Sequence, residues 1–197
     1  MSKLYFRYGA MNSGKSTALL QAAFNYEERG QKVLLAKPQI DTKGEASIVS
    51  RLGVVREADF TVAPGDRMRQ AFHAQREIAG GQISCLLIDE AQFLTAAQVD
   101  DLLRIAIDDD VPVLAYGIRT DFRTSAFPGS ARLLELAHSL EELKTICRCG
   151  RKAIFNTRRI GDRFVFDGDQ VAIDGVDATY ESLCAACYLA ESGGRLG

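Results

Sequence analysis

The chain has 197 residues and a formal net charge of −2, with 47% hydrophobic and 25% charged residues. This length suits one sizeable core with a small appendage, and the near-zero charge gives no reason to expect a nucleic-acid partner. No apolar run approaches the length of a membrane span, and no signal-peptide segment precedes the first strand, so we expect a cytoplasmic protein with reduced cysteines and no membrane partner.

The first predicted element is an aromatic-rich strand at residues 3–8, which runs directly into Gly9-Ala10-Met11-Asn12-Ser13-Gly14-Lys15-Ser16. These eight residues complete the G-x-x-x-x-G-K-[ST] pattern of a phosphate-binding loop. Glycines let the backbone curl so that successive N–H groups face phosphate oxygens. Lys15 can reach the β- and γ-phosphates, and the Ser16 hydroxyl can bind Mg²⁺. Helix formers follow, with no breaker before Gly30, so a helix N-terminus adds its positive end to the site.

Strand and helix signals then alternate along the chain. Further strands are predicted at residues 32–37, 83–89 and 111–117, and helices at 65–79, 95–106 and 131–138, with Thr95 as the N-cap of the second. This alternation predicts an α/β fold with a mostly parallel sheet, whose ligand sits at the carboxyl ends of the strands. The polar segment from Thr42 to Asp59 is expected to be a mobile surface loop.

An Asp-Glu pair ends the predicted strand at residues 83–89. Asp89 would help to hold Mg²⁺ beside Ser16, and Glu90 is placed to take a proton from the group that attacks the γ-phosphate. Two solvated carboxylates at a helix start are the alternative, but the phosphate loop favours the catalytic interpretation. The pair does not define the acceptor, because activation of water would make an ATPase and deprotonation of a substrate hydroxyl would make a kinase.

The remaining signal is a cysteine cluster after about Leu143, where glycine turns and short strands such as residues 163–166 replace the earlier alternation. Two close pairs, Cys147 with Cys149 and Cys184 with Cys187, suit a tetrahedral structural Zn²⁺, and four free or buried cysteines are the alternative. We therefore predict a nucleotide-binding domain over residues 1–143 and a small module over residues 144–197, in which zinc substitutes for a large core. Cys85 lies alone in a strand and is interpreted as a core residue.

Together these motifs resemble the cellular type of thymidine kinase, the type II family of bacteria and animals. The resemblance rests on residues 9–16, 89–93, 116–122 and 147–153, and on Tyr180 followed by the second cysteine pair and Tyr188. It implies an α/β, RecA-like P-loop NTPase core with a small zinc-binding lasso domain. It also implies ATP with Mg²⁺ as the donor, thymidine and deoxyuridine as acceptors, dTTP as a feedback inhibitor, and a homotetramer.

The resemblance assigns roles to individual residues. Glu90 matches the general base that acts on the 5′-hydroxyl of the nucleoside, and Asp41 and Lys43 match a flexible loop near the phosphates, with Lys43 in place of a more usual arginine. Tyr180 matches the residue that covers the base, next to a lasso loop at residues 171–179. The implied nucleoside-binding residues are Met11, Phe93, Ile118, Phe122, Phe127, Val171, Ile173, Gly175 and Tyr180. The implied nucleotide-binding residues are Gly9, Ala10, Met11, Asn12, Ser13, Gly14, Lys15, Ser16, Thr17, Asp89, Glu90, Ala91 and Gln92. The implied metal ligands are Cys147, Cys149, Cys184 and Cys187 for Zn²⁺, and Ser16 and Asp89 for Mg²⁺.

Three departures from the family pattern stand out. Ala91 occupies a position where the family often has glycine, residues 173–177 differ from the usual lasso run, and the first cysteine pair is C-x-C instead of C-x-x-C. None of them removes a catalytic group. Two other classes share part of the pattern: a RecA-like ATPase that acts with DNA or a protein partner, and a nucleotide-binding regulator whose zinc module is a docking surface. The small size, the lack of a basic stripe and the zinc-clipped lid favour the kinase.

Overall fold

The computed structural model describes residues 1–39, 47–50, 53–170 and 178–196. Six parallel strands form its central sheet: β1 (Leu4–Tyr8), β2 (Lys32–Pro38), β5 (Phe60–Val62), β6 (Ile83–Ile88), β7 (Val113–Gly117) and β8 (Ser139–Glu142). Their order is β5-β2-β6-β7-β1-β8, so the strand that leads into the phosphate loop lies between β7 and β8. The predicted α/β fold with a mostly parallel sheet is confirmed.

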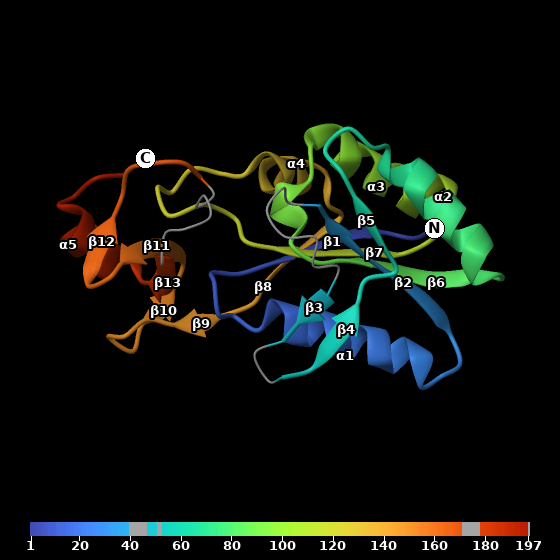
Figure 1. The fold of residues 1–197 in the computed structure, drawn as a ribbon, viewed down its shortest axis with the longest axis horizontal. Coiled ribbons are helices and arrows are strands. Elements are labelled where there is room, and N and C mark those ends of the chain that lie inside the picture. Colours follow the sequence, from blue (N-terminus) through green and yellow to red (C-terminus); the bar gives the residue numbers. More distant parts are fainter. Residues whose placement is uncertain (40–46, 51–52, 171–177, 197) are drawn as a thin grey trace.

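Helices cover both faces of this sheet. Figure 1 shows α2 (Met68–Ala79), α3 (Ala96–Asp108) and α4 (Pro128–Leu136) on one side, and α1 (Lys15–Glu27) on the other. Alternate residues of β2 divide between the two layers: Leu34 packs in the cluster that holds Phe72 of α2, and Leu35 packs in the cluster that holds Leu19 of α1. This alternation follows from the two-residue period of a strand, and it explains why every residue of β7, near the middle of the sheet, is buried.

Two strands of the sheet were not predicted. β5 has only three residues, which is too short for a periodic signal, and it pairs with the end of β2. β8 contains Glu141 and Glu142 and pairs with β1 at the edge of the sheet. Charged residues are typical of edge strands because they discourage pairing with other molecules. They also explain why a pattern of apolar residues does not predict β8 from the sequence.

The segment between β2 and β5 differs from its prediction. β3 (Ser47–Val49) and β4 (Val55–Glu57) form an antiparallel hairpin, so the expected surface loop is wrong for these residues. The physical reason is Ile48, which is fully buried in the cluster that contains α1. Asp41 and Lys43 lie outside the described residues.

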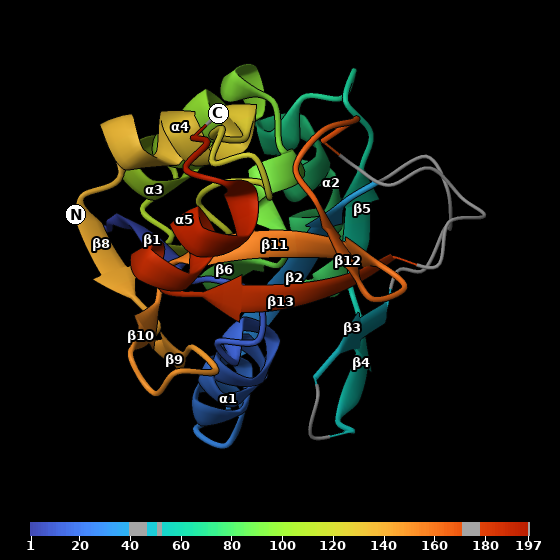
Figure 2. The ribbon, with the colours of Figure 1, turned by 90° about the vertical axis from the view of Figure 1, so that its left-hand side faces the viewer.

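A smaller unit follows the main sheet. It contains a hairpin of β9 (Thr145–Ile146) and β10 (Lys152–Ala153), an antiparallel sheet of β11 (Phe155–Ile160), β12 (Arg163–Val165) and β13 (Ala178–Leu183), and α5 (Ala185–Ser192). Its own core gathers Leu183 and Tyr188 with neighbouring aromatic rings. Figures 1 and 2 show this unit, hereafter the C-terminal module, at the end of the main sheet where β1 leads into the phosphate loop. No helix among the residues described here is long and apolar enough to cross a membrane.

The predicted start of α3 is confirmed by a capping box. Thr95 Oγ1 accepts a hydrogen bond from the Gln98 amide at 3.2 Å, and the Gln98 side chain accepts one from the Thr95 amide at 3.0 Å. α2 begins at Met68, later than predicted, because Asp66 closes the preceding turn by accepting from the Ala63 amide at 2.7 Å. α4 begins earlier than predicted, with a proline at its start.

Thr95→Ala is therefore expected to lower the free energy of unfolding by about 1 kcal/mol, because the Gln98 amide at the start of α3 loses its capping partner. Urea denaturation would measure the change. Thr95→Ser, which keeps the hydroxyl, is the matched control and should retain most of the stability. Equal losses in the two variants would show that the methyl group, not the cap, supplies the stabilisation.

Candidate active site

A cavity of about 420 Å³ opens at the carboxyl ends of β1, β6 and β7. One part of it is lined by the phosphate loop, and another by apolar and aromatic side chains, while the C-terminal module contributes three residues. Its lining comprises Met11, Asn12, Gly14, Lys15, Ser16, Thr17, Val49, Glu90, Gln92, Phe93, Ile118, Asp121, Phe122, Phe127, Asn156, Gln170 and Tyr180.

Most sequence-predicted site residues meet in this cavity, although they come from separate parts of the chain. The predicted nucleoside-binding residues that line it are Met11, Phe93, Ile118, Phe122, Phe127 and Tyr180. The predicted nucleotide-binding residues that do not line it are Gly9, Ala10, Ser13, Asp89 and Ala91, and the four predicted zinc ligands do not line it either. Val171, Ile173 and Gly175 lie outside the described residues. The lining residues that sequence reasoning missed are Val49, Asp121, Asn156 and Gln170.

The phosphate loop has the backbone shape that its glycines predict. Gly14 has a φ of 79° and directly precedes α1, which begins at Lys15. A Cβ atom on Gly9 would lie 2.5 Å from the carbonyl oxygen of Leu143, so that position has no room for a side chain. The Lys15 ammonium donates to the Ala10 carbonyl at 3.0 Å, which holds it over the loop. The loop therefore presents a helix N-terminus and a cation to the same volume, as an anion site requires.

A hydroxyl and a buried carboxylate meet beside the loop. Ser16 Oγ donates to Asp89 Oδ2 at 3.2 Å, and Asp89 is only 4% exposed. Burial, and then the neighbouring Glu90 charge, raise the pKa of Asp89 to about 6. A divalent cation held by Ser16 and Asp89 would further favour the charged form of this buried carboxylate, so the residues present fit a Mg²⁺ ion.

Asp89→Asn should stabilise the ligand-free protein at pH 7.5. A carboxyl whose folded-state pKa rises from 3.8 to about 6 contributes stability below pH 3.8, and that contribution is lost as the pH rises through 6. The loss at neutral pH is roughly 3 kcal/mol at most, so the amide variant should gain about 1–3 kcal/mol in urea denaturation without nucleotide or Mg²⁺. The gain should shrink at pH 5, where Asp89 is largely protonated.

The matched control is Asp100→Asn, which removes a half-exposed carboxylate paired with Arg132 and should change stability by less than about 1 kcal/mol. An Asp89→Asn protein that is less stable than the parent at pH 7.5 would contradict the conclusion that burial and the Glu90 charge disfavour the charged form of Asp89.

Glu90 is held at the strand end by an unusual backbone and by one buried amide. Its φ is 52°, in the left-handed region that few residues with side chains adopt. The Gln92 side chain donates to Glu90 Oε2, and its oxygen accepts from the Ile118 amide at 3.2 Å. Gln92 is 1% exposed, so its amide fixes the Glu90 carboxylate relative to the end of β7.

Two glycines make room for this segment. A Cβ atom on Gly117 would lie 2.7 Å from Gln92 Oε1, and one on Gly129 would lie 2.5 Å from the Ala91 carbonyl oxygen. Both distances are far below ordinary van der Waals contact, so residues 90–92 are packed between two backbones that carry no side chain at these points. Ala91, where the family often has glycine, is fully buried.

The apolar part of the cavity is a slot between rings. Phe93 and Phe127 pack edge to face with their centroids 5.4 Å apart, and Phe122 is 1% exposed. Such a slot, with a few polar groups at its border, suits a flat heterocycle more than a flexible chain. The sequence alone left these rings as either core or ligand wall; in the structure all three line the cavity, and Phe122 and Phe127 are also buried.

The C-terminal module is hydrogen-bonded to both halves of the cavity. Asn156 Oδ1 accepts from the Met11 amide at 2.7 Å, and its Nδ2 donates to the Thr120 carbonyl at 2.8 Å. The Ser182 hydroxyl donates to the Met11 carbonyl, and the Tyr188 hydroxyl donates to the Phe122 carbonyl at 2.8 Å. Isolated polar residues in short strands gave no sequence signal for these contacts. The module thus holds the phosphate loop and the aromatic wall directly.

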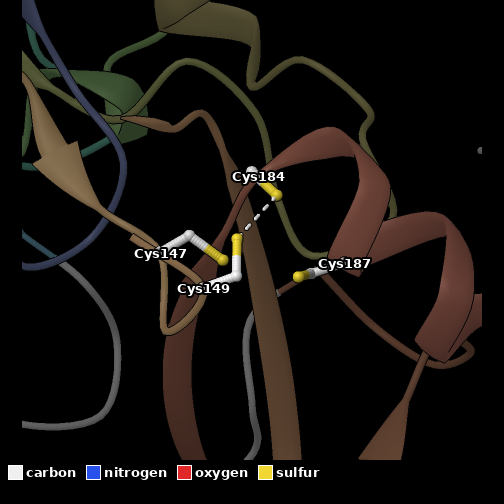
Figure 3. Close-up of side chains that lie close together, drawn as sticks. All are labelled: Cys147, Cys149, Cys184 and Cys187. Atoms are coloured by element: carbon white, nitrogen blue, oxygen red, sulfur yellow. Dashed lines mark hydrogen bonds between the residues drawn. The ribbon is translucent and has the colours of Figure 1, made fainter. Parts of the chain in front are cut away.

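The four paired cysteines converge within the C-terminal module, as Figure 3 shows. Their four Sγ atoms lie within 4.8 Å of one another, with Cys149 and Cys184 3.5 Å apart. A tetrahedral zinc site with Zn–S bonds of about 2.3 Å needs sulfur–sulfur separations of roughly 3.8 Å, so the cluster fits this ion. Burial opposes ionisation of Cys147, but the backbone amides of Cys149 and Cys184 outweigh it and lower its pKa to about 6, which favours the thiolate that metals bind. Cys85 lies apart in the sheet core, as predicted.

A phosphate loop, an Asp-Glu pair at a strand end and an apolar wall, grouped around one cavity, define a nucleotide-binding α/β protein of the P-loop class. Comparison with known proteins narrows the class: the thymidine kinase family model matches residues 2–188, so this chain belongs to the thymidine kinase family. The matched residues include both the P-loop core and the four clustered cysteines.

Named relatives agree over nearly the whole chain. A thymidine kinase of Chromobacterium violaceum is 47% identical over 190 residues, which is 95% of this chain and 98% of that protein. A thymidine kinase of Ruegeria pomeroyi is 48% identical over 187 residues, covering 93% of this chain and 92% of that protein. One of Idiomarina loihiensis is 50% identical over 188 residues, covering 93% and 94%.

Proposed function

We propose that this protein transfers the γ-phosphoryl group of ATP to the 5′-hydroxyl of thymidine, giving dTMP, and that it also accepts deoxyuridine. The observation that carries the proposal is the single cavity that joins the phosphate loop to the aromatic slot, with Glu90 in its wall. A donor site and an acceptor site that share one cavity favour transfer to a bound hydroxyl over hydrolysis. The family membership supports the same reaction.

Each group has a proposed task. The loop amides and Lys15 stabilise charge on the phosphoryl group that is transferred, and Ser16 with Asp89 holds Mg²⁺. When bound, this ion neutralises charge on the phosphate oxygens. Glu90 accepts the proton of the 5′-hydroxyl, and Gln92 keeps its carboxylate in place. The base and sugar are enclosed by six side chains of the cavity: Met11, Phe93, Ile118, Phe122, Phe127 and Tyr180.

Further properties are proposed on the family resemblance. We divide the chain into a nucleotide-binding domain at residues 1–143 and a zinc-binding lasso domain at residues 144–197, supported by the separate core around Tyr188. Zn²⁺ is held by the four clustered cysteines and has a structural role, because four protein ligands leave no open position. A homotetramer, inhibition by dTTP and a cytoplasmic location complete the proposal.

One assay tests the reaction. The protein is incubated with ATP, Mg²⁺ and one nucleoside at a time, and nucleoside monophosphate is separated and quantified. Thymidine and deoxyuridine should give product, and purine nucleosides should not, as membership of the thymidine kinase family implies. Absence of dTMP together with ATP hydrolysis stimulated by DNA would favour a RecA-like ATPase instead.

A further inference from the structure

Arg158 is a buried cation behind the wall of the cavity. It lies in β11, is 6% exposed and does not itself line the cavity. Its guanidinium carbon lies 3.9 Å from the centroid of the Phe122 ring, and its Nε donates to the Tyr180 hydroxyl at 3.3 Å. Its Nη2 donates to the carbonyl oxygens of Asp169 at 2.9 Å and Gln170 at 3.1 Å.

These partners are unusual for a buried arginine. Removing a guanidinium from water is costly, and a carboxylate commonly compensates the charge. Within the described residues Arg158 makes no ion pair, and its contacts are main-chain carbonyls, a phenol and the face of an aromatic ring. The charge is therefore compensated by the pocket wall itself, so the wall and the cation depend on each other.

The three wall residues that Arg158 contacts come from different segments. Phe122 follows β7, Gln170 follows β12, and Tyr180 lies in β13, and all three line the cavity. Three segments that are not neighbours in sequence can adopt many relative arrangements. A ligand that has to order them on binding loses part of its binding free energy to this ordering. The rigid, planar guanidinium of Arg158 contacts all three segments and restricts their arrangements before the ligand binds.

We propose that Arg158 is a positioning residue that pre-organises the nucleoside half of the cavity and leaves the phosphate half unaffected. That this half of the cavity binds a nucleoside rests on the proposed function, whereas the contacts of Arg158 are independent of it. The phosphate loop is held separately, through Asn156 and Ser182. Loss of Arg158 should therefore weaken the binding of thymidine and leave the binding of ATP nearly unchanged.

The test compares Arg158→Met, Arg158→Lys and a matched control, Arg159→Met. Arg159 is the next residue of β11, on its other face, where it contacts the Phe164 ring at 5.1 Å and Glu181 at 3.7 Å. Calorimetry should show the Kd for thymidine raised about tenfold or more in Arg158→Met, with the Kd for ATP changed less than about twofold. Arg158→Lys, which keeps the charge without the planar fork, should fall between, and Arg159→Met should match the parent.

A second readout needs no ligand. Amide hydrogen exchange of the ligand-free Arg158→Met protein should be faster at residues 121–125 and 178–183 and unchanged in the central sheet. Unchanged exchange in those two segments would overturn the proposal. So would faster exchange throughout the sheet, or loss of bound zinc, since Arg158 would then support the whole fold. A parent protein that fails to bind thymidine would overturn the proposed function, while the exchange comparison would still decide the role of Arg158.

Discussion

Replacing Glu90 with glutamine is expected to lower kcat for thymidine phosphorylation by about 10²–10⁴-fold while ATP binding stays unchanged. Glutamine has the same shape, and its oxygen can still accept the hydrogen bond from Gln92, so the segment between Gly117 and Gly129 should keep its packing. What disappears is a carboxylate that can take the hydroxyl proton. Steady-state kinetics of dTMP formation and calorimetric titration with ATP measure the two effects.

A control variant separates charge from chemistry. Glu135→Gln removes an exposed carboxylate of α4 that pairs with Arg132, and its kinetics should match the parent. If the Glu90 variant turned over thymidine at a rate near that of the parent, Glu90 would not be the base. If it lost ATP affinity as well, its main role would be to hold the nucleotide.

Removal of the proposed zinc ion is expected to have the second large effect, with loss of both substrate affinities. The C-terminal module has a small core, so its fold should depend on the ion that links the β9–β10 turn to α5. Without that fold, Met11 loses the partners of its amide and its carbonyl, and Phe122 loses the Tyr188 hydroxyl. Cys184→Ser, or a strong chelator, should therefore abolish activity and not merely reduce thermal stability.

Metal content by mass spectrometry and amide exchange of residues 145–160 check this expectation. Cys85→Ala is the control, because it removes a buried thiol of the main sheet and should leave the metal content intact. Acid should act as chelation does, since protons compete for the thiolates. Full activity of a protein shown to lack metal would contradict the structural role.

The sequence could predict the main sheet because its central strands carry strong signals. β6 and β7 are apolar runs that need no neighbour to be recognised, and the glycine pattern of residues 9–16 fixed the start of α1. Edge elements depend on what they pack against. β8 is polar, and Ile48 is the only fully buried residue of the β3–β4 hairpin within the part of the chain described, so neither stands out without the tertiary structure.

For the site, residue types with distinct chemistry were predictable and structural polar contacts were not. Sequence motifs identify Glu90 as a candidate base and Asp89 and the paired cysteines as candidate metal ligands. In the structure Glu90 lines the cavity, Asp89 contacts Ser16, and the four cysteines cluster together. Asn156 belongs to no such motif. Its structural role depends on its hydrogen bonds with the Met11 amide and the Thr120 carbonyl, which are far from it in sequence. Those partners are fixed by the docking of the module, which no local pattern encodes.

The contacts of Met11 also bear on how the protein is made. The phosphate loop leaves the ribosome before the C-terminal module, because Asn156 and Ser182 follow Met11 by 145 and 171 residues. Contacts of such separation form slowly, and the loop is left without them throughout synthesis. On the proposed function, the nascent chain therefore cannot complete its ATP site until the C-terminal module has been translated and has bound the proposed zinc ion. Zinc supply during synthesis, and not only during catalysis, would then set the yield of active enzyme.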